Sequence, residues 1–127
     1  MQIVRDRYEA FVAGDLEGVL KGCDLDIVSY TAPPFADAAE YQGHEGLLRW
    51  MGNWTEGFDQ FEMEVEEYMD AGDHVVVRAF QRATGAISGA PVEARFWFVN
   101  TVRDGKIVRM GAYPDESEAL EAAGLSR

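Results

Sequence analysis

The chain has 127 residues, 47% of them hydrophobic and 12% aromatic, which indicates one globular domain over residues 1–127 and excludes an intrinsically disordered chain. Its formal net charge of −12 repels phosphate backbones and anionic lipid, so we expect no nucleic-acid partner and no membrane surface. Cys23 is the single cysteine, which excludes an internal disulfide, and charges at residues 5–7 interrupt any secretory leader, so we expect a cytoplasmic protein.

The chain begins with helical periodicity. Residues 3–12 place apolar side chains at helical intervals, and Gly14 favours an end to that helix. Asp15 is a suitable N-cap for a second short helix over residues 15–23. We therefore expect two short helices before the first strand.

A short strand and a third helix follow. Residues 26–34 indicate a strand that ends at the pair Pro33-Pro34, which cannot continue a ladder, and residues 35–42 indicate a loop. The third helix is expected to begin near His44. Its apolar stripe, with spacings of three, four and four residues, consists of Leu47, Trp50, Trp54 and Phe58.

The second half of the chain alternates with the period of β-strands. Residues 61–69 place apolar side chains on one face and glutamates on the other, which indicates a half-buried strand. Further strands are expected over residues 74–83, 91–102 and 106–113, followed by a capped helix over 117–125. The last two strands form a hairpin across Arg103-Asp104-Gly105, which we expect to be a three-residue turn with a bulge at Gly105. Helices followed by an antiparallel sheet predict an α+β domain.

This hairpin is apolar on both faces. Because side chains alternate along a strand, Phe96, Phe98, Asn100 and Val102 share one face, and the residues between them point the other way. The three helices can cover one face of such a sheet, and no segment remains for the other. We therefore expect a homodimer formed through the outer face of the sheet.

Three stretches of the sequence carry a family resemblance. They are "AGDLEGV" after the first helix, "YQGHEGLLRW" at the start of the third, and the run from "VRDGKIVR" to "EALEAAGL" at the end. Together with the order of the elements, they resemble SnoaL-like proteins of the NTF2-like superfamily, whose relatives include ketosteroid isomerase, polyketide cyclases and limonene epoxide hydrolase. The resemblance implies a strongly bent sheet and three helices that form a cone with a deep apolar pocket, commonly as a dimer.

The acid–base residues of these relatives do not transfer to this chain. The oxyanion-hole tyrosine of the isomerase corresponds to Arg7, and the adjacent Tyr8 lies about 100° further around the helix, so we expect it to point elsewhere. The positions at which relatives carry catalytic carboxylates fall at Thr31, at Phe98 or Trp97, and near Ala112. The resemblance thus implies the fold and the pocket without the usual carboxylates.

Apolar side chains of the third helix and the hairpin are candidates for the pocket wall, with ordinary core packing as the alternative for each. Two tryptophans on one stripe favour a cavity, because a buried indole N–H needs a partner. The predicted ligand-binding residues are Trp50, Trp54, Phe58, Phe96, Phe98, Met110 and Ala112.

Three polar residues are candidates for catalysis. Asn100 interrupts an apolar run and could polarise a ligand's carbonyl, or it could satisfy a buried backbone group. Tyr30 could donate to a ligand's oxygen or pack at the mouth of the cone. His44 could be a general base or a residue that caps the third helix. Two histidines thirty residues apart and one cysteine do not make a metal site, and no cofactor is expected.

The sequence therefore predicts a small-molecule protein with an apolar pocket. It could be an isomerase, cyclase or hydrolase that acts on a hydrophobic oxygenated compound by hydrogen-bond polarisation. The alternatives are a non-catalytic binder of a hydrophobic ligand and a dimeric interaction scaffold. Arg78 and Arg95 could pair with an acidic ligand or with the glutamates of residues 61–69.

Overall fold

The structure has the predicted α+β architecture. The computed structural model describes residues 2–31, 40–55, 58–85 and 87–124, without the side chains of Asn53 and Trp54. The elements in chain order are α1 (Gln2–Val12), α2 (Leu16–Lys21), β1 (Cys23–Thr31), β2 (Glu40–Gln42), α3 (Gly43–Thr55), β3 (Phe58–Ala71), β4 (His74–Gly85), β5 (Pro91–Arg103), β6 (Lys106–Tyr113) and α4 (Glu116–Ala122). Each predicted helix and strand has a counterpart here, and the predicted end of the first strand at Pro33-Pro34 lies outside the described residues. The short β2 was not predicted, because its three residues lay in the stretch interpreted as a loop.

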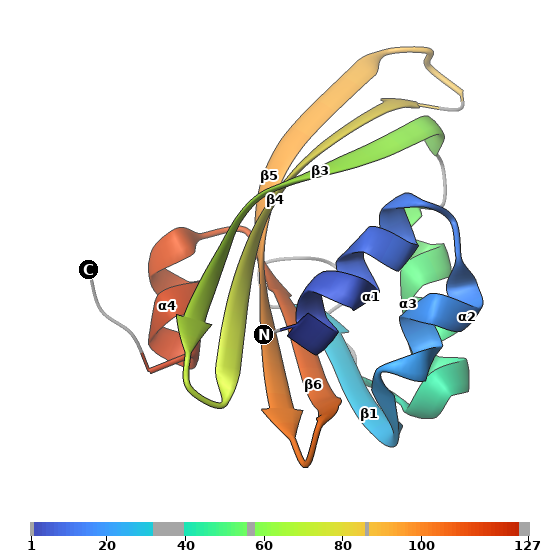
Figure 1. Cartoon of the computed structure of the whole chain (residues 1–127). Coiled ribbons are helices and arrows are strands. Elements are labelled where there is room, and N and C mark those ends of the chain that lie inside the picture. The colour runs from blue at the N-terminus through green and yellow to red at the C-terminus, as the bar shows by residue number, and fades with distance from the viewer. Residues whose placement is uncertain (1, 32–39, 56–57, 86, 125–127) are drawn as a thin grey trace.

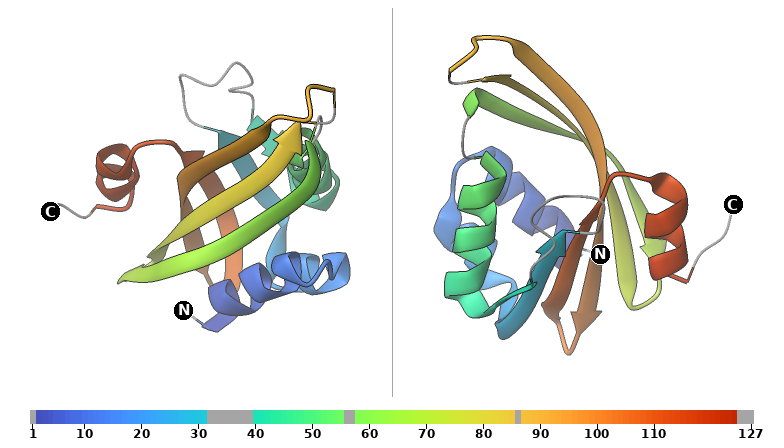
Figure 2. Two further views of the ribbon diagram at one scale, coloured as in Figure 1. Left: turned by 90° about the horizontal axis from the view of Figure 1, so that it is seen from above. Right: turned by 180° about the vertical axis from the view of Figure 1, so that it is seen from behind.

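One six-stranded sheet, in the order β2-β1-β6-β5-β4-β3, forms the body of the molecule. Neighbouring strands are antiparallel except for β1 and β6, which pair in parallel, so the prediction of an antiparallel sheet is wrong at this joint. The helices α1, α2 and α3 lie on one face, over which the far ends of β3, β4 and β5 bend, and α4 lies on the other face (Figures 1 and 2). We call the face toward α1–α3 the inner face and the face toward α4 the outer face.

Side-chain caps begin the two short helices. Asp15 precedes α2, and its carboxylate accepts a hydrogen bond from the backbone N–H of Gly18 at 3.1 Å, as predicted. Asp115 does the same for α4 by accepting from the backbone N–H of Ser117 at 2.7 Å. These caps fix where each helix starts.

The β5–β6 hairpin has a tighter turn than predicted. Arg103 pairs with Lys106, and both Asp104 and Gly105 have positive φ angles of 52° and 75°, so the turn contains two residues instead of three. The register then shifts between Thr101 and Val102, which leaves one extra residue on β6. Because this bulge adds the residue that the shorter turn removes, the inward side chains of both strands are still the predicted ones.

The outer face is partly covered by the chain itself. Residues of α4 pack on side chains of β3, β4 and β5 in a second hydrophobic cluster, which consists of Met69, Val76, Val99, Ala119, Leu120 and Ala123. The expectation that no segment remains for this face is therefore wrong, because the last helix returns to the sheet (Figure 1).

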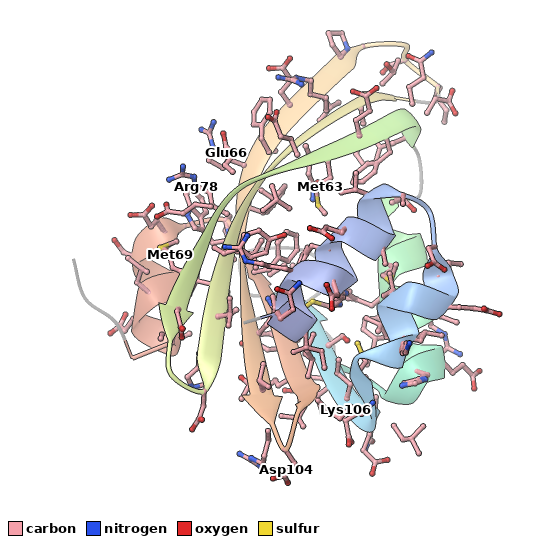
Figure 3. All side chains as sticks on the ribbon, viewed as in Figure 1. Met63, Glu66, Met69, Arg78, Asp104 and Lys106 are labelled. Atoms are coloured by element: carbon pink, nitrogen blue, oxygen red, sulfur yellow. The ribbon has the colours of Figure 1, made fainter. Side chains whose placement is uncertain are left out.

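The rest of the outer face carries ion pairs. Arg78 lies 3.3 Å from Glu66 and 3.1 Å from Glu67, and Arg95 lies 2.6 Å from Glu66. The hydrogen bond from Arg95 holds the pKa of Glu66 below its usual range. Both Glu66 and Arg78 point away from the three helices, whereas Met63 of β3 points toward them (Figure 3). The two arginines thus pair with glutamates of β3, Arg78 from the adjacent β4 and Arg95 from β5, as one of the two predicted alternatives requires.

Candidate functional site

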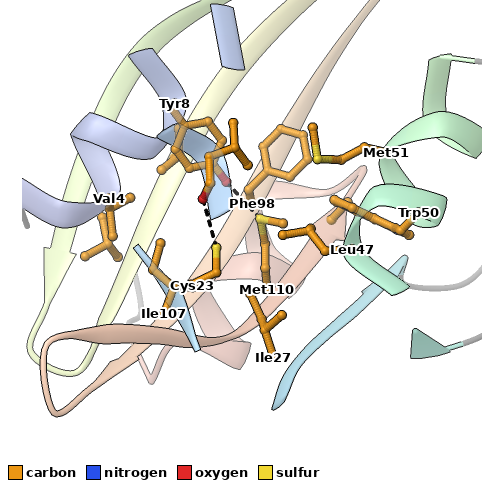
Figure 4. Packing of buried hydrophobic residues seen from close by; sticks show 14 of the residues in the cluster. Val4, Tyr8, Cys23, Ile27, Leu47, Trp50, Met51, Phe98, Ile107 and Met110 are labelled. Carbon is orange, nitrogen blue, oxygen red and sulfur yellow. Dashed lines mark hydrogen bonds between the residues drawn. The ribbon is translucent and has the colours of Figure 1, made fainter. Parts of the chain in front are cut away.

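A small cavity lies between α1, α3 and the inner face of the sheet. Its volume is about 20 Å³. Figure 4 shows side chains from α1, α3, β5 and β6 that converge on this region. The lining residues are Arg7, Tyr8, Phe11, Trp50, Met51, Met63, Gln81, Phe98 and Met110.

The cavity is much narrower than the deep pocket that the sequence predicted. A volume of about 20 Å³ holds roughly one water molecule. Three methionines, Met51, Met63 and Met110, take up the space around it. Methionine side chains are unbranched and adapt to irregular gaps, so their movement is the least costly way to enlarge this cavity.

A buried pair of polar side chains stands at the cavity wall. The amide nitrogen of Asn100 donates to the hydroxyl oxygen of Tyr8 at 3.1 Å, and it lies 3.4 Å from the backbone oxygens of Val75 and Phe98. The Tyr8 hydroxyl can donate either to Asn100 Oδ1 or to the sulfur of Met110, each at 3.3 Å. Tyr8 lines the cavity. Asn100 is fully buried and does not line it, but its hydrogen bond to the Tyr8 hydroxyl fixes the position of that group.

The phenol of Tyr8 keeps its proton across the physiological range. Burial raises the pKa of Tyr8 to about 12, against the opposing effects of the nearby Arg7 charge and the Asn100 hydrogen bond. At neutral pH this side chain therefore presents an O–H donor to the cavity and not a phenolate.

The structure places only part of the predicted ligand-binding set on this wall. Trp50, Phe98 and Met110 line the cavity. Ala112 is fully buried and Phe96 half-buried in the same core, away from the cavity. Phe58 was expected on the third helix, but it begins β3 and is 37% exposed, so that prediction is wrong. The side chain of Trp54 lies outside the described residues.

Two of the three predicted catalytic residues lie away from the cavity. The hydroxyl of Tyr30 hydrogen-bonds to that of Tyr113, and its ring lies over Gly111, which pairs with Val99 of the outer cluster. Tyr30 is thus on the opposite face of the sheet from Asn100, and the expectation that both contact one ligand is wrong. The Nε2 atom of His44 lies 2.9 Å from the backbone oxygen of Cys23, where it ties α3 to β1.

The contact between Tyr30 and Gly111 makes a prediction about stability. A Cβ atom at position 111 would overlap the Tyr30 ring and would lie 2.6 Å from its Cε1 atom. We expect Gly111→Ala to lower the free energy of unfolding by about 1–3 kcal/mol, because the ring must move and lose its bond to Tyr113. Urea unfolding followed by circular dichroism measures this change.

Gly52→Ala is the matched control. Gly52 lies in α3, and a Cβ at this position meets nothing within 4 Å. Since alanine is the better helix former, this variant should be neutral or more stable by up to about 1 kcal/mol. Equal effects at positions 52 and 111 would contradict the proposed overlap with Tyr30.

Sequence reasoning missed the contribution of α1 to the site. It placed Arg7 at the position of a catalytic tyrosine and expected Tyr8 to point elsewhere, yet both side chains are buried and line the cavity. The available signal was the spacing of Val4, Tyr8 and Phe11, which are four and three residues apart and share one side of the helix.

A second, wider hollow of about 620 Å³ lies at the far ends of β3, β4 and β5. All of its lining residues are exposed or half-exposed, and they include Glu62, Arg82 and Glu93. Because it is open and lined with charges of both signs, it lacks the enclosure of a small-molecule site.

The described ranges contain neither a metal-binding cluster nor a membrane-spanning helix. No group of three or more histidine, cysteine, aspartate or glutamate residues among them could hold a metal ion. Within the same ranges, no helix combines the length and apolarity that a membrane crossing requires.

Comparisons with solved structures give relatives of this fold. An NTF2-like protein from Burkholderia thailandensis E264 is 25% identical with a TM-score of 0.81, and the match covers 98% of this chain and 96% of the other. TerC, crystallised with polyporic acid, is 22% identical with a TM-score of 0.77 and coverage of 97% and 96%. A protein from Jannaschia sp. CCS1 described as a SnoaL-like polyketide cyclase is 20% identical with a TM-score of 0.76 and coverage of 99% and 94%.

A search of curated proteins finds no match to this chain. Comparison with protein families finds a match to the SnoaL-like domain over residues 4–110. This stretch includes every lining residue of the cavity. The chain therefore belongs to the SnoaL-like domain family and has the NTF2-like fold.

Proposed function

We propose that the chain binds a small, largely apolar molecule that carries a carbonyl or another oxygen, and that the Tyr8 hydroxyl donates a hydrogen bond to this oxygen. The observation that carries the proposal is the position of Tyr8, which lines the cavity and whose hydroxyl keeps its proton. Around it the wall offers rings and thioethers, which suit an apolar molecule.

The present partners of the Tyr8 hydroxyl leave its proton available to a ligand. Its oxygen acceptor, Asn100 Oδ1, lies at 3.3 Å, whereas a good O–H···O hydrogen bond is about 2.7–2.8 Å long. Its other acceptor is the thioether sulfur of Met110, which accepts hydrogen bonds only weakly. The amide of Asn100 also donates to the Tyr8 oxygen, which polarises the O–H group and strengthens it as a donor. Asn100 thus acts on the ligand through Tyr8 and is a positioning residue.

The chemistry of the described wall supports binding best. Its polar groups are a phenol, an amide and a guanidinium, which at neutral pH are hydrogen-bonding groups and not proton acceptors for acid–base catalysis. Stabilisation of an oxyanion by the Tyr8–Asn100 pair is the second candidate, and it would suit an isomerase, cyclase or hydrolase. The ligand of TerC and the description of the Jannaschia protein support a small-molecule role of either kind.

Replacement of the hydroxyl tests this proposal. We expect Tyr8→Phe to weaken the binding of acetophenone about 5-fold, because the loss of one neutral hydrogen bond costs about 1 kcal/mol. Binding of α-methylstyrene, which has the same shape without the oxygen, should change by less than about 2-fold. Below the Tyr8 pKa of about 12 the donor keeps its proton, so the affinity for acetophenone should stay flat from about pH 6 to pH 10. Titrations followed by NMR, with the Trp50 indole N–H as reporter, measure these affinities.

Tyr68→Phe is the matched control, because Tyr68 packs edge-on against the Tyr8 ring without lining the cavity. It should leave both affinities unchanged. If acetophenone binds equally well to the wild type and to Tyr8→Phe, Tyr8 is not the donor. If neither probe shifts the Trp50 signal, the cavity is not a binding site.

Binding and catalysis can be separated without knowing the ligand. Native mass spectrometry of the purified protein, followed by extraction, reports whether an apolar compound is retained. A compound that is recovered unchanged after prolonged incubation supports a binder, and its conversion into a product of different mass or retention time supports an enzyme.

We also infer a homodimer through the part of the outer face that α4 leaves open. The indole nitrogen of Trp97 on this face is buried and has no hydrogen-bond partner in the described residues, and Arg78, Arg95 and Glu66 next to it provide charges of both signs. A two-fold interface can match such charges with their copies. Sedimentation equilibrium measures the mass in solution, and a monomer at high concentration would rule the dimer out.

A further inference from the structure

A buried cation shares the cavity wall with Tyr8. Arg7 is only 3% exposed, and its side chain lines the cavity. It lies on the buried side of α1, three residues after Val4, where an apolar residue is the ordinary choice. A guanidinium at such a position loses most of its hydration and requires a partner.

The described residues do not supply a counter-ion for Arg7. None of their carboxylates lies within 4 Å of it, since the ion pairs among these residues are formed by Arg49, Arg78, Arg95 and Arg109. Its Nε atom is buried and has no hydrogen-bond partner in the described structure. Its guanidinium carbon lies 4.8 Å from the centre of the Tyr8 ring, a contact that orients the group but does not neutralise it.

The other ionisable neighbour of Arg7 is a thiol that stays protonated. Burial raises the pKa of Cys23, and this effect outweighs the lowering by the Arg7 charge and by a hydrogen bond between Arg7 and the thiol. The Cys23 thiol donates to the backbone oxygen of Val19 at 3.2 Å, which also requires its proton. Within the described residues, the positive charge of Arg7 therefore has no anionic partner, and an anion that enters the cavity would supply one.

From this geometry we infer that the ligand is an anion, namely an apolar molecule with a carboxylate or a similarly acidic enol. This inference rests on the proposed binding function and narrows its ligand class. Arg7 and Tyr8 present a guanidinium and a phenol from adjacent positions of α1, and the two oxygens of a carboxylate can accept one hydrogen bond from each. The apolar part of the ligand lies against Phe98, which packs beside Tyr8, and against Trp50 and Met51 of α3.

Benzoate and benzamide are the probes, because they have nearly the same shape and differ in charge. At pH 7 and 0.15 M NaCl, we expect the wild type to bind benzoate at least about 10-fold more tightly than benzamide, since charge-assisted hydrogen bonds are roughly twice as strong as neutral ones. Arg7→Met should remove this preference and change benzamide binding by less than about 2-fold. Arg7→Lys, which keeps the charge, should retain part of the preference. NMR titrations on the Trp50 indole signal measure all affinities, and circular dichroism confirms that each variant is folded.

Arg49→Met is the matched surface control. Arg49 is exposed on α3, where it pairs with Glu45 at 3.5 Å, so this variant should keep the full preference for benzoate. A preference that disappears in Arg49→Met, or that persists in Arg7→Met, would overturn the inference.

Binding of the three probes to the wild type tests the inference without any variant. This comparison is decisive even if Arg7→Met does not fold. If acetophenone and benzamide bind but benzoate binds no better, the ligand is neutral, and the inference fails while the proposed function stands. If none of the three probes binds, both fail.

Discussion

Phe98→Ala is expected to destabilise the protein by about 3–5 kcal/mol and to enlarge the cavity, so that the variant binds benzene more tightly than the wild type does. Phe98 is 4% exposed, its ring centre lies 5.8 Å from that of Tyr8, and it forms part of the cavity wall. Removal of a buried ring from a core costs this much because the space does not fully collapse. Removal of the ring also adds the space it occupied to the existing cavity. An apolar cavity of this combined size can bind benzene. Urea unfolding measures the loss, and benzene at about ten times its dissociation constant should raise the melting temperature by roughly 5 °C.

Phe58→Ala is the control for both parts of this prediction. Phe58 lies at the start of β3 and is 37% exposed, so its removal should cost less than about 1 kcal/mol and should leave benzene binding as it is in the wild type. If Phe98→Ala loses the expected stability but benzene gives no added stabilisation, the neighbouring methionines have closed the space. That outcome would show that the wall of the cavity rearranges more readily than expected.

Asn100→Asp is expected to lower the free energy of unfolding by about 4 kcal/mol at pH 7, counting only the burial of the ionisable carboxyl. Asn100 is fully buried, and burial of this degree raises the pKa of a carboxyl by about 3–5 units. A carboxyl whose pKa is higher in the folded state than its unfolded value of about 3.9 contributes no penalty below that value. Above it the penalty grows by about 1.4 kcal/mol per pH unit until the pH passes the folded-state pKa.

The pH dependence distinguishes this cause from a simple loss of hydrogen bonds. At pH 5 the part of the destabilisation that comes from charge burial should be only about 1.5 kcal/mol. This pH is about one unit above the pKa of the carboxyl in the unfolded state, so keeping the carboxyl protonated in the folded state costs little free energy. Urea unfolding at pH 5, 6, 7 and 8 measures the destabilisation. Gln42→Glu on the exposed side of β2 should show no such trend. A penalty at position 100 that does not change with pH would mean that water or a cation reaches this site.

The helices and most of the strands could be predicted because their signals are local. The apolar stripe of α1, the Asp15 cap of α2 and the alternation in β3 lie within a few residues of each other, and the structure contains all three. The inner faces of β5 and β6 were also predicted correctly. This success depended on a compensation, because the turn at Asp104-Gly105 is one residue shorter than expected and the bulge on β6 restores the alternation.

The face of Tyr30 could not be predicted from the alternation of β1. Tyr30 was expected to contact a ligand or to pack at the mouth of the cone, yet the structure buries its neighbours Ser29 and Thr31 on the inner face instead. Thr31 is stable there because its hydroxyl accepts a hydrogen bond from the Trp50 indole at 2.9 Å. That contact joins β1 to α3, and no signal within the strand reveals it.

The volume of the cavity could not be predicted from the sequence, for a different reason. Residue types on the wall follow from the fold, but the space between them depends on the side-chain rotamers of several residues at once. The family resemblance implied a deep pocket, and here Met51, Met63 and Met110 leave about 20 Å³. The unpaired charge of Arg7 likewise emerged only when the positions of all described carboxylates were known.

The parallel pairing of β1 with β6 has a consequence for how the chain reaches its native state. Tyr30 and Tyr113, which meet across this pair, are 83 residues apart in sequence. During synthesis on the ribosome β1 emerges early, and it must wait for nearly all the remaining residues before its partner exists. Until then its edge is open to other chains, and because long-range strand pairing is slow, we expect this protein to depend on dilute conditions or chaperones while it folds.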